Sequence, residues 1–210
     1  MVSLSFLARK EKVKGLIGHF GLADWWVSAF SAQERQHIKQ TFRPLGASPS
    51  DDSLTSRDVS YFNQSVVSFL SNLAGWFGKK EDRTIAYRIL QKAEELIATK
   101  EISPLDIHFL FHNKLTLYYK DRENPKSLDM AIRACRQQIA IADKAARAFQ
   151  TDYSGDSLPG HMGYSQLAII FERQKHFDQA IELYSQAMHQ GWGGDWEKHI
   201  QRCKKKMLSA

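Results

Sequence analysis

The sequence predicts an all-α protein built from antiparallel helical hairpins, on three observations. Residues 161–192 repeat large, small and aromatic side chains at the spacing of two packed helices, where small residues allow close approach and aromatic residues fill the space beside the pair. Residues 67–100 match the same pattern. The chain has only 5 prolines and 12 glycines in 210 residues and shows no strand pattern. Because one hairpin cannot bury its apolar face alone, the pattern predicts an array.

Residues 1–45 predict an N-terminal helical unit that is rich in tryptophan. Within it, Ser31 followed by Glu34 is a capping box, which predicts a helix over about 32–42. Residues 46–57 are rich in Ser, Asp, Gly and Pro. This composition predicts a linker between the N-terminal unit and the rest of the chain.

A helical-repeat domain is expected over residues 58–208. Thr55 with Asp58 offers a second capping box at its start. The apolar pattern that follows predicts a long helix over about 59–77.

The first hairpin, about residues 67–100, is predicted from the spacing of the later segment. The pattern of the later segment consists of seven positions, here named the signature positions, each of which requires a large or a small side chain. When Ala86 is aligned with Ala180, the remaining six positions of the first hairpin also hold residues of the required size. The seven positions are Leu70, Leu73, Ala74, Phe77, Ala86, Leu90 and Ala93, against Tyr164, Leu167, Ala168, Phe171, Ala180, Tyr184 and Ala187. Since the template comes from the later segment alone, this match is independent support for a repeat.

The stretch between these two segments predicts a degenerate hairpin over about residues 105–150. Residues 106–120 have the apolar spacing of a first helix, and a polar turn with Pro125 follows. A second helix carries Ala131 and is expected to continue through Phe149, well past the standard repeat length.

The third hairpin, about residues 161–194, is expected to be followed by a capping helix. Asp195 can cap this last helix, which spans residues 195–208 and has a basic polar side. Terminal helices of this kind cover the exposed apolar edge of a repeat array.

These segments resemble the tetratricopeptide-repeat family over residues 67–208, whereas residues 1–57 carry no recognised pattern. One departure is Trp192, which stands where the family usually has proline. The resemblance implies a right-handed superhelix of helix pairs whose groove binds a peptide or a partner helix. The family's carboxylate clamp of Lys and Asn is missing, because its positions here hold Ser71, Gly75, Ser165 and Ile169. Binding of a chaperone C-terminus is therefore not expected.

The composition is that of an ordinary globular protein, with 43% hydrophobic and 25% charged residues. The net charge of +6 allows an acidic partner or nucleic acid. Cys135 and Cys203 are far apart and indicate no disulfide framework. No apolar stretch is long enough for a membrane span or a secretory signal. We expect a cytoplasmic protein that does not enter a membrane.

No catalytic or metal-binding pattern stands out. His108 and His112 lie four residues apart, but apolar residues separate them and no third ligand is signalled. No Gly-rich phosphate loop follows a strand, and no serine is placed with a histidine base by a known motif. We therefore expect no enzyme activity, no metal and no cofactor.

The leading hypothesis is a protein-protein interaction adaptor that binds another protein or a peptide. Its candidate contact residues lie on first helices or at their ends, or in the tryptophan pair of the N-terminal unit. They are Lys79, Asn113, Ile169, Glu172, Arg173, Trp25 and Trp26. A simpler function for the tryptophan pair is to anchor the N-terminal unit on the first hairpin.

Two alternatives stay open. The basic clusters from Arg9 to Lys14 and from Arg202 to Lys206 favour a nucleic-acid-associated regulator. The chain could also form a homo-oligomer as a self-associating scaffold, through its tryptophan pair or its last helix.

Overall fold

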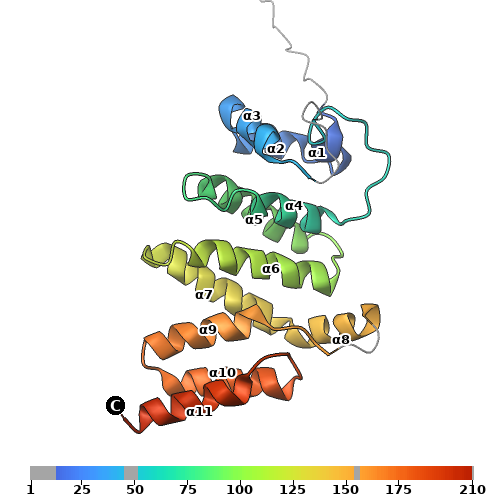
Figure 1. Ribbon diagram of the computed structural model, residues 1–210. Helices are drawn as coiled ribbons and strands as arrows, with labels where there is room; N and C mark the ends of the chain where they lie inside the picture. Colours follow the sequence, from blue (N-terminus) through green and yellow to red (C-terminus); the bar gives the residue numbers. More distant parts are fainter. Residues whose placement is uncertain (1–12, 45–51, 154–156, 210) are drawn as a thin grey trace, which may run out of the picture. The chain divides into compact units, whose positions relative to one another are not determined.

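The structure is a computed structural model that describes residues 13–44, 52–153 and 157–209. These residues form helices α1 to α11 and contain no β-strand (Figure 1). The prediction of an all-α protein is confirmed. The chain divides into two compact units, residues 1–64 and 65–210. None of the described helices is both long and apolar enough to cross a membrane.

The described part of the first unit contains three short helices. They are α1 (Gly15–His19), α2 (Ala23–Ala29) and α3 (Ala32–Thr41). The predicted capping box is confirmed, because the Ser31 hydroxyl accepts the Glu34 N–H at 3.2 Å and the Glu34 carboxylate accepts the Ser31 N–H at 2.8 Å. Apolar side chains of these helices and their flanks are buried. They are Leu16, Ile17, Leu22, Trp26, Phe30 and Ile38.

The described part of the predicted linker, residues 52–57, packs on α1. Backbone N–H groups of α1 donate to the carbonyls of Ser53 and Leu54 at 3.0 Å. Asp52 turns the chain here, because its carboxylate accepts the Leu54 N–H at 3.1 Å. These residues belong to the first unit, and the division between the units falls later in the chain. Residues 46–51 lie outside the described residues.

The helix predicted over 59–77 is shorter in the structure. Its counterpart, α4 (Val66–Gly75), begins after Ser65, whose hydroxyl accepts a backbone N–H of the first turn at 3.1 Å. The expected cap, Thr55, instead donates its hydroxyl to Asp52 at 2.6 Å. The predicted start was wrong because the backbone here bonds to the start of α1: the carbonyls of Thr55 and Arg57 accept the N–H groups of Lys14 and Gly15 at 2.9 Å and 2.8 Å.

The second unit consists of α4 to α11, and consecutive helices pack in pairs (Figure 1). The helices after α4 are α5 (Arg83–Ile97), α6 (Pro104–Tyr119), α7 (Pro125–Ala140), α8 (Ala142–Asp152), α9 (Met162–Arg173), α10 (Phe177–His189) and α11 (Trp196–Met207). Hairpin 1 is α4 with α5, hairpin 2 is α6 with α7, and hairpin 3 is α9 with α10. Hairpin 2 contacts hairpin 1 mainly through α6 and contacts hairpin 3 mainly through α7 and α9, while α11 packs on α10.

The signature positions lie on the packed faces of their hairpins. All seven positions of hairpin 1 are buried. In hairpin 3 only Phe171 is half-buried, and the other six positions are buried. Alanines at these positions allow the two helices of a pair to approach closely.

The sequence predicted that the second helix of hairpin 2 continues through Phe149, but in the structure it does not. α7 ends at Ala140, and α8 takes a new direction after Ile141 (Figure 1). The bend places α8 against α6, where Phe149 and three alanines join a buried cluster that includes Tyr164 and Trp192. If α7 continued straight, these apolar side chains would extend along the axis of α7 and would not pack on α6. The break is therefore explained by the burial of the apolar face of α8.

A buried lysine joins hairpin 1 to hairpin 2. The side chain of Lys114 on α6 is 2% exposed and donates to the carboxylate of Glu94 on α5 at 2.5 Å. Gln137 on α7 donates to the other Glu94 oxygen at 2.6 Å. Burial alone would raise the pKa of Glu94, but these hydrogen bonds and the lysine charge hold it below its usual range. The Glu94 carboxylate of α5 thus links hairpin 1 to both helices of hairpin 2.

The loops before and after hairpin 3 are tied together. The N–H of Gly193 donates to the carbonyls of Leu158 at 3.1 Å and Pro159 at 3.0 Å. A side chain at Gly193 would not fit, because a Cβ there would lie 2.8 Å from the Leu158 carbonyl oxygen. The chain therefore enters and leaves this hairpin at neighbouring points.

Candidate interaction site

The two predicted tryptophans differ in exposure. Trp26 is 3% exposed and its ring centroid lies 5.4 Å from that of Phe30. Trp25 is half-buried and meets Phe30 edge-on, also at 5.4 Å. Trp26 is therefore a packing residue of the first unit, and only Trp25 offers partial surface to a partner. Anchoring of this unit on hairpin 1 stays a prediction.

Asn113 connects two hairpins. Its amide on α6 donates to the hydroxyl of Ser71 on α4 at 2.8 Å. The residue is half-buried, and Ser71 is 2% exposed. Asn113 was predicted as a contact residue for a partner, but in the structure its amide bonds to the neighbouring hairpin.

Glu172 also holds helices together. Its side chain is 8% exposed and accepts from Arg202 at 2.5 Å, from Lys206 at 3.2 Å and from the Tyr184 hydroxyl at 2.8 Å. Burial alone would raise the pKa of this carboxyl, but the hydrogen bonds from these partners outweigh it and hold the pKa at about 2. Glu172 therefore links α9 to α10 and α11 and presents little carboxylate to a ligand.

The remaining predicted residues lie on the surface in two places. Lys79 is exposed in the turn of hairpin 1, whereas Ile169 and Arg173 are exposed on α9. Ile169 keeps 37% of its surface exposed. Arg173 lies at the end of α9 and donates to the Tyr119 hydroxyl at 2.9 Å. The structure thus brings Arg173 to the turn of hairpin 2.

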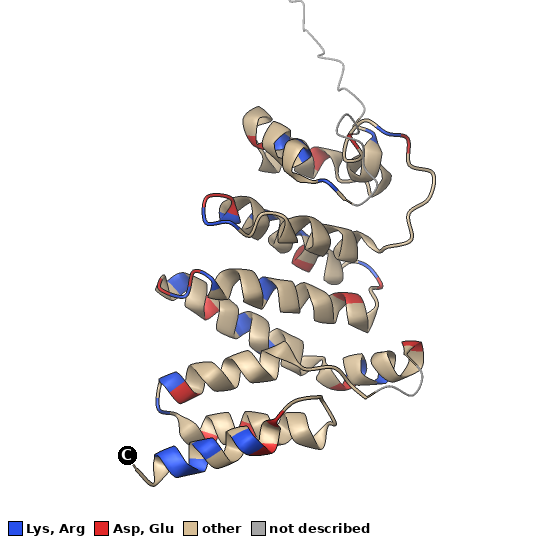
Figure 2. Ribbon diagram, in the orientation of Figure 1, with Lys and Arg blue, Asp and Glu red and all other residues tan. Residues whose placement is uncertain are grey.

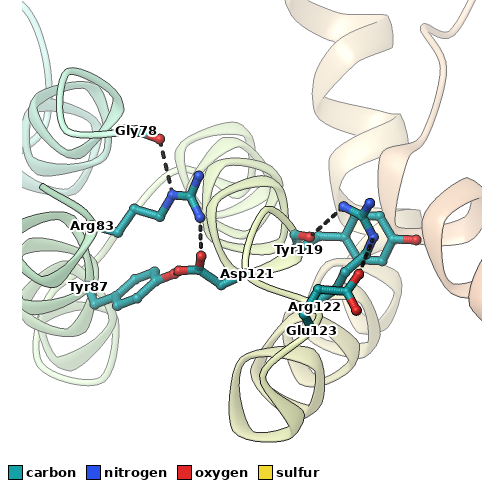
Figure 3. A network of polar contacts seen from close by, with 7 residues as sticks. All are labelled: Gly78, Arg83, Tyr87, Tyr119, Asp121, Arg122 and Glu123. Atoms are coloured by element: carbon teal, nitrogen blue, oxygen red, sulfur yellow. Dashed lines mark hydrogen bonds and ion pairs between the residues drawn. The ribbon is translucent and has the colours of Figure 1, made fainter. Parts of the chain in front are cut away.

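A cleft of about 200 Å³ opens at this point. The residues that line it, here named the Tyr119 cleft, are Tyr119, Arg122, Glu123, Leu128, Ile170, Arg173 and Gln174. The Arg122 guanidinium lies over the Tyr119 ring, 5.0 Å from its centroid, and donates to the Tyr119 carbonyl at 3.3 Å (Figure 3). One tyrosine therefore contacts two arginines, of which the sequence predicted only Arg173.

The neighbouring polar cluster in the same turn is internally satisfied (Figure 3). Asp121 accepts from the Arg83 guanidinium and from the Tyr87 hydroxyl, the latter at 2.5 Å. The Tyr87 ring stacks on Tyr118 with centroids 4.1 Å apart. Burial and then the hydrogen bond to Asp121 raise the pKa of Tyr87. This cluster fastens α5 to the turn of hairpin 2 and leaves its charges compensated.

A longer hollow, here named the α7–α10 groove, runs between hairpins 2 and 3. It has a volume of about 430 Å³ and continues along α7 into a hollow of about 530 Å³, with Arg136 and Ala140 lining both. Its apolar floor comes from α7, α9 and α10. These floor residues are Ile139, Leu167, Phe171 and Leu183. Exposed Arg136 and Glu182 lie on the rim.

The first histidine of α6 packs against a histidine of hairpin 3. His108 is buried and meets His161, the cap of α9, with ring centroids 5.1 Å apart. Both rings also contact Trp192, and the Gln138 amide donates to the His108 carbonyl at 3.0 Å. The described residues contain no group of three or more possible metal ligands.

Burial sets the charge of these two imidazoles. It lowers the pKa of His108 to about 4 and that of His161 to about 3, and the neighbouring imidazole lowers the His161 value further. His161 Nδ1 accepts the Tyr164 N–H at 3.3 Å. Within the described part of the chain, His108 Nδ1 and His161 Nε2 have no hydrogen-bond partner. The pair is therefore an uncharged packing element between α6 and hairpin 3.

Three basic side chains of the clusters proposed for nucleic acid pair with carboxylates. Figure 2 shows positive residues along α11, but Arg202 and Lys206 of this helix bind Glu172. In the N-terminal cluster, residues 9–12 lie outside the described residues, and Lys14 pairs with Asp58 at 3.1 Å. Lys198, Lys204 and Lys205 of the same helix are exposed.

Comparison with protein-family models, curated proteins and solved structures gives no significant match to this chain. The resemblance to the tetratricopeptide family therefore rests on the sequence pattern.

Proposed function

We propose that this chain is a cytoplasmic, non-catalytic adaptor. In this proposal, residues 65–209 form a tetratricopeptide-like array, wound as a right-handed superhelix, that binds a peptide or helix of another protein. The observation that carries the proposal is the α7–α10 groove, an open hollow with an apolar floor. Two buried free thiols, Cys135 and Cys203, support a reducing compartment.

The groove has the chemistry of a helix-binding surface. Ile139, Phe171 and Leu183 are half-buried, so each keeps apolar surface that a partner can cover. An amphipathic helix presents apolar side chains at positions i, i+3, i+4 and i+7, and such a row fits a groove of this kind. Arg136 on one wall and Glu182 on the other supply opposite charges that would orient the partner.

The groove lining supports binding more than chemistry. Its residues include no Ser, Cys, His or Lys that could act as a nucleophile or a proton carrier. Among the described residues, Glu182 lines the hollow of about 430 Å³ and Asp129 lines its continuation, and both are exposed. A catalytic carboxyl is usually paired with a second titratable group in a closed site.

The test is affinity capture from the native host with two matched variants. Ala140 is exposed at the end of α7 and lines both hollows. Ala140→Glu would place a charged chain over the apolar floor. Ala98 is an exposed alanine directly after α5 on hairpin 1, and Ala98→Glu is the control. Both variants should keep the unfolding temperature of the wild type.

We expect wild type and Ala98→Glu to recover the same proteins and Ala140→Glu to lose them by about tenfold or more. Equal recovery by Ala140→Glu would overturn the groove as the binding surface. Recovery of no specific protein by the wild type would overturn the adaptor function itself.

The two alternatives from the sequence have less support. A nucleic-acid role depends on positive charge, and Glu172 already compensates Arg202 and Lys206. A mobility shift with DNA or RNA at low salt tests this role. Light scattering at several protein concentrations tests self-association.

A further inference from the structure

We propose that the Tyr119 cleft binds the phosphate group of a phosphorylated side chain in a peptide. This goes beyond the proposed function, because the cleft is a different surface from the α7–α10 groove and has different chemistry. It lies where the turn of hairpin 2 meets the end of α9.

The first argument is uncompensated charge. The cations that join hairpins elsewhere have a close acidic partner: Lys114 binds Glu94, and Arg83 binds Asp121. In the described part of the chain, the bond of Arg173 goes to the uncharged Tyr119 hydroxyl. Arg122 has Glu123 at 3.8 Å, but that carboxylate is on a side chain that is 93% exposed, where water screens the pair.

The second argument is preorganisation. Tyr119 holds Arg122 over its ring face and Arg173 at its hydroxyl, so both guanidinium groups are positioned before a ligand arrives. A guanidinium has five N–H donors, and these contacts use few of them. Because the Tyr119 hydroxyl accepts from Arg173, its own O–H remains to donate to a ligand. The cleft therefore presents mainly donors.

The third argument is the number of acceptor oxygen atoms that a ligand needs to use all the donor groups of the cleft. Two guanidinium groups and one hydroxyl are three donor groups, and a phosphate monoester has three terminal acceptor oxygens. A carboxylate has two oxygens, which a single guanidinium can satisfy. The two cations of the lining, Arg122 and Arg173, outnumber its one carboxylate, Glu123, so the cleft favours an anion. Leu128 is half-buried in the same cleft and offers apolar contact to a residue beside the phosphorylated one.

The test is fluorescence anisotropy on the full chain with a labelled peptide library that has phosphoserine at its centre and random flanking residues. Matched libraries have serine or glutamate at the centre, and inorganic phosphate serves as a competitor. We expect the phosphoserine library to bind about tenfold more tightly than the glutamate library, and the serine library to bind least. Inorganic phosphate should displace the phosphoserine library.

Two double variants localise the binding. Arg122→Gln with Arg173→Gln should weaken binding by about tenfold or more. Lys126→Gln with Lys175→Gln removes the same charge from exposed lysines outside the cleft and should leave binding nearly unchanged. If the double glutamine variant of the arginines unfolds, Arg122→Lys with Arg173→Lys replaces it. This variant keeps the positive charge but lacks the paired N–H donors of a guanidinium, so it should also weaken binding.

Equal binding of the three libraries, or equal binding by the two glutamine variants, would overturn the proposal. Preference for glutamate would assign the cleft to carboxylates, and binding of inorganic phosphate alone would exclude a peptide source. Ala140→Glu should keep phosphopeptide binding, so failure of the α7–α10 groove and failure of this cleft are distinguishable.

Discussion

At its junction with hairpin 1, hairpin 2 buries the charged amine of Lys114 against Glu94, whereas at its junction with hairpin 3 it buries the uncharged imidazole of His108 beside His161. The first junction is satisfied, because Gln137 completes the bonds of the carboxylate. The second has an unpartnered ring nitrogen on each histidine within the described part of the chain. Hairpins of similar design are thus joined by different chemistry, and the two junctions should respond differently to mutation and to pH.

The largest effect is expected at the charged junction. Lys114→Ala leaves Glu94 without its cation in a mostly buried position, and we expect the free energy of unfolding to fall by about 3 kcal/mol. Urea denaturation measures this change. Lys92→Ala is the control, since Lys92 pairs with Glu95 on the surface, and its loss should stay below about 0.5 kcal/mol. Similar losses for the two variants would show that burial does not strengthen the Lys114 pair.

A smaller effect is expected at the second junction when the pH falls. Folded His108 and His161 stay neutral down to their lowered pKa values, but in the unfolded chain they take up protons near pH 6.5. Because the unfolded state then binds more protons, the free energy of unfolding falls as the pH falls. From about pH 7.5 to about pH 5.5, we expect a loss of about 1.4 kcal/mol for each histidine.

Denaturation at a series of pH values tests this dependence. Glu94 has a lowered pKa and remains ionised over this range, so the charged junction should change little. His161→Asn keeps an acceptor at the cap of α9 and removes one titrating group. It should remove about 1.4 kcal/mol of the pH dependence, while His108, His112 and His199, whose pKa values are also lowered, keep the rest. An unchanged slope in this variant would contradict the assignment.

Close packing at the second junction predicts the next effect. A Cβ on Gly163 would lie 2.8 Å from the Gln138 amide oxygen and 3.0 Å from the Cys135 carbonyl oxygen. Gly163→Ala should therefore destabilise the protein by about 1–3 kcal/mol, although alanine favours a helix. Gly75→Ala is the control, because a Cβ there has no described neighbour within 4 Å. Thermal unfolding should show a lower midpoint for the first variant alone.

The smallest effect concerns Asn113, which belongs to the first junction. Asn113→Ala removes the bond to the buried Ser71 hydroxyl and should cost about 1 kcal/mol. A double-mutant cycle with Ser71→Ala measures the coupling directly. Zero coupling would indicate that Asn113 is available to a partner, as the sequence predicted.

The fold could be predicted from the sequence where a pattern is local. The seven-position spacing identified the packed faces of hairpins 1 and 3, and the capping box at Ser31 fixed the start of α3. The bend at Ile141 was missed because both α7 and α8 have helical apolar spacing, and the choice between one helix and two depends on α6. Likewise, the hydroxyl of Thr55 had two possible partners that local sequence does not rank.

The candidate site was harder to predict because its contacts are remote in sequence. Asn113 and Glu172 are polar residues on first helices, which is what a binding groove requires. Their partners, Ser71 and Arg202, come from other helices, and these contacts become visible only after folding. The Tyr119 cleft combines a turn with a helix end for the same reason. Polarity alone does not distinguish a ligand contact from a contact between helices.

The hydrogen bonds that join the loops before and after hairpin 3 at Gly193 affect how this hairpin responds to mechanical tension. The bridge between Gly160 and Gly193 is parallel, so pulling on the two flanks of the hairpin shears the bifurcated bond from the Gly193 N–H to Leu158 and Pro159. Force transmitted along the chain would therefore load this bond before it reaches α9 and α10.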